Sequence, residues 1–172
     1  MKNYICDGTK YTYNKGYITL PVEINNLPEQ IYVEGLELHP RSTFHVSLLC
    51  VKNLIEKYGD KIQNLEQKIL EYFCTYIAGN EISFLGYKDV FRLATFEERR
   101  SVVVLCGVSD LDNFIRSLES HLDIEISLQP THATLYTLQP DVGIGLNSQA
   151  DMKEKSVPIQ VSEDVRRSLG LV

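Results

Sequence analysis

Two short segments of this chain carry the same four-residue pattern of histidine, apolar residue, hydroxyl residue and leucine. The first is His45-Val46-Ser47-Leu48 and the second is His132-Ala133-Thr134-Leu135. Residues two apart on a strand project from the same face of a sheet. Each segment is therefore expected to be a strand that carries its histidine and hydroxyl on one face and apolar side chains on the other. The chain has only four histidines, so half of them lie in this pattern.

The sequence around the two patterns alternates between strand and helix periodicity. Strands are predicted over 16–22, 31–38, 42–51, 81–96 (with a kink at Gly86), 101–108, 124–128 and 131–138, and a last hairpin over 142–147 and 157–161. Helices are predicted over 52–77 (with a break at Gly59), from the candidate cap Ser109 to about 122, and over 162–169. Each half of the chain holds one histidine pattern. The sequence thus predicts an α+β fold of two small sheet-plus-helix lobes related by a rough duplication.

Charge and composition limit the class of partner. The net charge is −6, and no run of cations is longer than two. A protein that follows long nucleic acid usually carries a basic face, so a small phosphate-bearing ligand in a local pocket fits better. We expect no membrane span, because no stretch reaches the ~18–20 apolar residues that one needs. The N-terminal segment also lacks the apolar core of a secretory signal, so a cytoplasmic protein is expected.

The four cysteines show no CxxC spacing. Cys50, Cys74 and Cys106 each lie in an apolar run, which is typical of reduced thiols in a core. A disulfide pair remains the alternative. No His, Cys or Asp residues fall at close metal spacing, so neither a metal nor another cofactor is expected.

Two histidines that face each other across a groove can act as a general acid and a general base near neutral pH. Nearby hydroxyls can donate hydrogen bonds to an anion held between them. This is a metal-free arrangement for cleaving a phosphodiester. The alternative is structural: two half-buried strand histidines, each hydrogen-bonded to a local hydroxyl.

At these residues the chain resembles the two-histidine (2H) phosphoesterases, which include RNA 2',3'-cyclic phosphodiesterases once named 2'-5' RNA ligases. Their signature is a pair of histidine–apolar–Ser/Thr–apolar motifs, and the resemblance covers roughly residues 16–161. It implies a single bilobal domain over 1–172 with pseudo-twofold symmetry, two small and mainly antiparallel sheets, helices packed outside and a central groove. It also implies metal-independent hydrolysis or transfer at a 2',3'-cyclic phosphate or a related 2'-linked ester. The acidic charge favours small substrates: cyclic nucleotides, ADP-ribose cyclic phosphate, 2',5'-linked oligoadenylates or cyclic oligonucleotides.

The expected site follows from these motifs. We expect His45 and His132 to be the acid/base pair, with His132 favoured as the base, and Ser47 and Thr134 to bind the phosphate. Tyr136 continues the alternation of the second motif and Arg41 precedes the first, so both are candidate substrate contacts. His39 and His121 are followed by no such motif and are not expected to be catalytic. A monomer acting on a small nucleotide or oligonucleotide is expected, and the rival is a non-catalytic module that binds a nucleotide or RNA end in the same groove.

Overall fold

The structure is a computed structural model that describes residues 3–172. In this range the chain forms nine strands, all paired antiparallel, in the order β1-β2-β5-β8-β7-β6-β9, with β4 paired to β8 and β3 to β4. The strands are β1 (Thr12–Asn14), β2 (Tyr17–Val22), β3 (Ile31–Val33), β4 (Leu36–Pro40), β5 (Phe44–Cys50), β6 (Phe84–Phe96), β7 (Arg99–Val108), β8 (His132–Thr137) and β9 (Ser156–Ile159). The α+β class and the antiparallel pairing are confirmed, and the sheet is large. Pairing of β5 with β8 joins the strands of both halves into one sheet. The expectation of two separate small sheets is therefore wrong.

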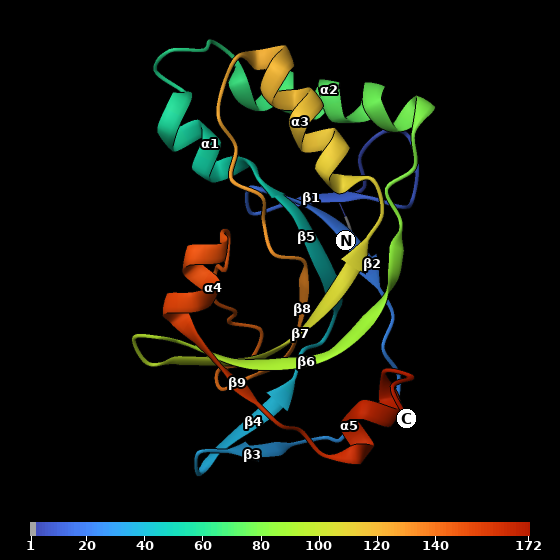
Figure 1. Cartoon of the computed structure of the whole chain (residues 1–172), viewed down its shortest axis with the longest axis vertical. Coiled ribbons are helices and arrows are strands. Elements are labelled where there is room, and N and C mark those ends of the chain that lie inside the picture. The colour runs from blue at the N-terminus through green and yellow to red at the C-terminus, as the bar shows by residue number, and fades with distance from the viewer. Residues whose placement is uncertain (1–2) are drawn as a thin grey trace.

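Five helices lie outside the sheet in the described range. They are α1 (Val51–Tyr58), α2 (Leu65–Gly79), α3 (Leu111–Leu122), α4 (Gln149–Lys155) and α5 (Glu163–Ser168). Figure 1 shows α1, α2 and α3 gathered at one end of the molecule, while α5 lies at the other end with the C-terminus. None of the helices in the described range is long and apolar enough to cross a membrane.

Three apolar clusters hold these layers together. The largest joins the inner faces of α1, α2 and α3 to β2 and β5, and Phe73 and Phe114 are fully buried in it. A second cluster joins β6, β7 and β8 to α5 through Val165. A third, smaller cluster places Ile144, Leu146 and Met152 over β6 and β7. Burial of this apolar surface fixes where each strand lies and, with it, the position of the histidines.

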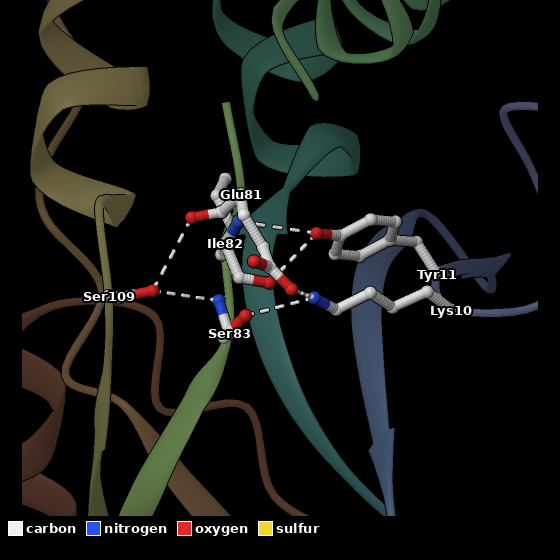
Figure 2. A network of polar contacts seen from close by, with 6 residues as sticks. All are labelled: Lys10, Tyr11, Glu81, Ile82, Ser83 and Ser109. Atoms are coloured by element: carbon white, nitrogen blue, oxygen red, sulfur yellow. Dashed lines mark hydrogen bonds and ion pairs between the residues drawn. The ribbon is translucent and has the colours of Figure 1, made fainter. Parts of the chain in front are cut away.

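A polar network ties the N-terminal segment to the middle of the chain (Figure 2). The Tyr11 hydroxyl donates to the Ile82 carbonyl at 2.8 Å, and the Lys10 ammonium donates to Glu81 and Ser83 at 2.8 and 2.9 Å. Ser109 accepts from the backbone N–H of Ser83 at 2.9 Å. This network holds residues 10 and 11 against the start of β6.

Ser109 does not cap α3, as the sequence suggested. The residue before the helix is Asp110, which has a left-handed backbone and makes no side-chain cap hydrogen bond. The reason is the network just described, because it uses the Ser109 hydroxyl to join the end of β7 to Glu81 and Ser83, which precede β6.

Three strand predictions are also wrong. The predicted strand over 31–38 is a hairpin, because Glu34 and Gly35 both adopt positive φ angles and turn the chain between β3 and β4. Residues 124–128 form no strand, although Ile124 and Ile126 are buried in the largest cluster. Residues 142–147 also form no strand, and α4 follows them where no helix was expected.

The prediction of reduced cysteines is right for Cys50 and Cys106 and wrong for Cys74. Cys50 and Cys106 are free and buried, whereas Cys74 forms a disulfide with Cys6 across a sequence separation of 68. The pairing depends on how α2 lies against the N-terminal segment, which the spacing of cysteines does not reveal.

Candidate functional site

The two histidine patterns lie on adjacent central strands. Val46 of β5 is paired directly with Ala133 of β8 in antiparallel register. One step along this register sets His45 opposite Thr134 and Ser47 opposite His132, and directly opposed residues share a face of a sheet. All four side chains line a single groove with a volume of about 1290 Å³. The structure therefore brings together the four residues that the sequence singled out.

Both strands carry a β-bulge at the last residue of the pattern. In β5 the pairing with β2 steps from Ser47 to Leu49, and Leu48 has no partner there. In β8 the pairing with β7 steps from Thr134 to Tyr136, and Leu135 has no partner there. A bulge inserts one residue and so reverses the alternation of faces beyond it.

The bulge in β8 explains why the expectation for Tyr136 is wrong. Because Leu135 is the extra residue, Tyr136 turns to the apolar face that Ala133 occupies. Its side chain is fully buried, and its hydroxyl donates to the Pro28 carbonyl at 2.9 Å. Tyr136 therefore supports the core and does not line the groove.

His132 is held in one orientation by its neighbour in the chain. Its Nδ1 lies 2.8 Å from the carbonyl oxygen of Pro130. A carbonyl can only accept, so Nδ1 carries the proton of the neutral ring and Nε2 keeps the lone pair. Burial lowers the pKa of His132, and the hydrogen bond to Pro130 opposes this effect. A neutral His132 with a free Nε2 is suited to accept a proton.

His45 is also biased towards its neutral form. Burial, followed by the positive charge of Arg41 and by His132, lowers the pKa of His45 to about 4. The influence of Arg41 and His132 reflects how close these groups lie to the imidazole. An anion bound among them would oppose the shift, because it favours the protonated ring.

Arg41 reaches the groove, as the sequence suggested. Its backbone N–H donates to the Leu135 carbonyl at 2.9 Å, which joins the start of β5 to the bulge of β8. Its Nε lies 3.7 Å from Asp141 Oδ1, and this carboxylate also accepts from the backbone N–H and hydroxyl of Ser42 at 3.0 and 2.9 Å. The Ser42 bonds, with Arg41 nearby, lower the pKa of Asp141. The Arg41 side chain is only 17% exposed, and its Nε has no hydrogen-bond partner.

Tyr17, Lys52 and Asn147 also line the groove. Tyr17 opens β2, and its hydroxyl accepts from Asn147 Nδ2 at 3.1 Å. The Lys52 ammonium lies 5.8 Å from the centre of the Tyr17 ring. Tyr17 shares its strand face with Thr19, which opposes Ser47, so strand alternation could have pointed to Tyr17. No sequence signal pointed to Lys52 or Asn147.

The groove is cationic although the chain is acidic. The charged residues that line it are Lys10, Lys15, Arg41, Lys52 and Arg99, against Glu23 and Asp141. Such a local excess attracts an anion of limited size. The other two histidines lie elsewhere: His39 is exposed beside Glu37, and His121 stacks on Tyr72. Among residues 3–172, no group of three or more His, Cys, Asp or Glu side chains is placed to hold a metal ion.

No family model matches the chain, and comparison with curated proteins and with solved structures finds no significant match. The functional assignment therefore rests on the residues of the groove.

Proposed function

We propose that the protein is a metal-independent phosphodiesterase that acts on 2',3'-cyclic phosphates or related 2'-linked or cyclic nucleotide phosphodiesters. The observation that carries the proposal is the direct pairing of Val46 with Ala133. This pairing sets two histidines and two hydroxyls around one point of a cationic groove, and these are the groups that proton transfer at a phosphodiester requires.

The strand registers support a pseudo-twofold, bilobal relationship between the two halves. An antiparallel pair has a local two-fold axis at each directly opposed pair of residues. About the axis at Val46 and Ala133, His45 maps onto His132 and Ser47 onto Thr134. The same operation relates the two bulges, because Leu48 maps onto Leu135. A single random strand crossing would not also match the bulges.

In the mechanism that follows, the phosphate lies between the two histidines, and Ser47 and Thr134 donate to its non-bridging oxygens. His132 accepts the proton of the attacking water through Nε2. His45, protonated when the anionic phosphate is bound, gives its proton to the leaving oxygen. Each turnover leaves the two histidines with exchanged protonation states, and solvent restores them.

The groove supports a small nucleotide or oligonucleotide as the substrate. Its excess of cations is local, while the net charge of the chain is −6. We do not propose long nucleic acid as a substrate. We propose that the protein acts as a monomer. A cytoplasmic location belongs to the proposal too, and the Cys6–Cys74 disulfide is the observation against it.

The test is turnover of a panel of 2',3'-cyclic mononucleotides and of cyclic di- and trinucleotides, with the products identified. Activity should survive EDTA, because the scheme uses no metal. Loss of activity on chelation, with recovery on adding Zn²⁺ or Mn²⁺, would replace the two-histidine scheme with a metal-hydroxide mechanism.

One observation favours the rival, a nucleotide-binding module without turnover. Both histidines have lowered pKa values, so neither is poised as an acid in the ligand-free groove. Binding of the panel measured by thermal shift, set beside the turnover assay, separates the two. Binding without any product would establish the module.

A further inference from the structure

A strip of bare backbone forms part of the groove wall. Residues 143–147 all line the groove, and within them the side chains of Ile144 and Leu146 are buried in the third apolar cluster. We call this segment the glycine strip. It places two residues without side chains where any other residue would narrow the groove.

Each glycine accommodates a different polar side chain. A Cβ at Gly143 would lie 3.3 Å from Nη1 of Arg41. A Cβ at Gly145 would lie 3.3 Å from the hydroxyl of Tyr17 and from Nδ2 of Asn147. The strip therefore extends from Arg41, next to the catalytic histidines, to the contact between Tyr17 and Asn147.

Each end of the strip carries a polar atom without a partner. Nε of Arg41 is a buried donor without a hydrogen-bond partner, since Asp141 Oδ1 lies 3.7 Å away, and Oδ1 of Asn147 is a buried acceptor without one. Buried polar groups in folded proteins are nearly always hydrogen-bonded, so two exceptions along one groove wall call for a reason. One atom is a donor and the other is an acceptor, so the two ends of the strip favour different groups of a ligand.

Asn147 is held firmly in place. Its backbone N–H donates to Asp151 at 3.0 Å, and Ser148 caps α4 directly after it. Its Nδ2 donates to Tyr17, and Oδ1 is the acceptor that remains for a ligand. A ligand that satisfies Oδ1 must present a donor, such as an N–H group.

We propose that the glycine strip sets the direction in which a nucleotide lies, with its phosphate at Arg41 and an amino group of its base at Asn147. The inference rests on the proposed function for the phosphate and adds a specificity-determining residue. Arg41 Nε donates to a phosphate oxygen, and Asn147 Oδ1 accepts from the exocyclic amino group of a base such as adenine.

The experiment compares two substrates that differ by this amino group: adenosine 2',3'-cyclic phosphate and purine riboside 2',3'-cyclic phosphate. Wild type should prefer the adenosine compound about ten-fold in kcat/KM, as expected for one hydrogen bond to a buried partner. Asn147→Ala should bring the ratio close to one. Asn14→Ala, which removes another asparagine lining the same groove, should keep the wild-type ratio. The readout is the ratio of kcat/KM for the two substrates within one variant. A variant that is only partly folded therefore gives the same ratio.

Wild type without a preference, or an Asn147→Ala variant that keeps it, overturns the proposal. Calorimetric binding of adenosine 2'-monophosphate and purine riboside 2'-monophosphate separates this failure from that of the proposed function. A binding preference that Asn147→Ala removes, without turnover of any phosphodiester, supports the strip and rejects the phosphodiesterase. Turnover without a base preference does the reverse.

Discussion

Val46 and Ala133 oppose each other directly where β5 and β8 cross. Both side chains are fully buried on the apolar face. The residues on either side of them therefore project into the groove, and the two histidines occupy diagonal corners of a four-residue array. In the proposed mechanism, this diagonal allows one imidazole to act from each side of the phosphate.

Replacing His45 or His132 by alanine should each reduce turnover by about 10²–10⁴-fold, the usual contribution of a general acid or base. His39→Ala is the matched control, because His39 is exposed and lies outside the groove. The measurement is kcat/KM on the best substrate of the panel, with circular dichroism to verify folding. Near wild-type turnover in either of the first two variants would remove that histidine from the mechanism.

Ser47→Ala and Thr134→Ala should each lower kcat/KM by about ten- to a hundred-fold, since a hydrogen bond to a charged phosphate is worth roughly 1.5–3 kcal/mol. The shape of the pH profile should not change, because neither hydroxyl titrates in this range. Unchanged kinetics in these variants would mean that the hydroxyls only fill the strand faces.

The pH profile of kcat/KM should be bell-shaped with its optimum below about 6.5, the ordinary pKa of histidine. The rate requires one protonated and one neutral imidazole, and burial lowers the pKa of both. The singly protonated pair is therefore most populated on the acid side of that value, and the two limbs belong to the pair. The profile of kcat should lie at higher pH, because the bound phosphate anion raises both pKa values. An optimum above pH 7 for kcat/KM would contradict the lowered pKa values.

Stability should also depend on His45. Its pKa is about 4 in the folded protein and near 6.5 when unfolded, so the unfolded chain binds more protons between these values. The stabilisation is present above pH 6.5 and is lost as the pH falls towards 4. From pH 7.5 to 5 this amounts to about 2 kcal/mol of unfolding free energy. Urea unfolding of His45→Asn should show a correspondingly smaller loss. Equal losses in wild type and His45→Asn would show that His45 is not desolvated.

Groove residues were predictable from the sequence where the regular alternation of strand side chains decides which face they lie on. They were not predictable where the backbone departs from a regular strand. His45, Ser47, His132 and Thr134 face one groove because each pair lies two apart on a strand without interruption. Tyr136 does not follow the same alternation, because the extra residue Leu135 turns the Tyr136 side chain to the opposite face of the sheet. No local pattern announces that bulge.

The remaining groove residues depend on tertiary contacts. Asn147 reaches Tyr17 only because Ile144 and Leu146 anchor the glycine strip to β6 and β7. The alternation of residues 142–147 resembled a strand, and one apolar face is indeed buried. The segment nevertheless pairs with no strand in the part of the chain that the structure describes. The alternation of apolar residues therefore predicts which face is buried, but not whether the segment pairs with another strand.

The Cys6–Cys74 disulfide should be detectable from the number of free thiols and from the effect of reductant on stability. Protein purified without reductant and then denatured should show two reactive thiols, from Cys50 and Cys106, and four after reduction. The disulfide closes a loop with a sequence separation of 68, so reducing it should lower the unfolding free energy by about 4 kcal/mol in the chain-entropy model. The double variant Cys6→Ser with Cys74→Ser should resemble the reduced wild type and no longer respond to reductant. Four thiols before reduction would show that the pair is reduced in the purified protein, and would remove the one observation that opposes a cytoplasmic location.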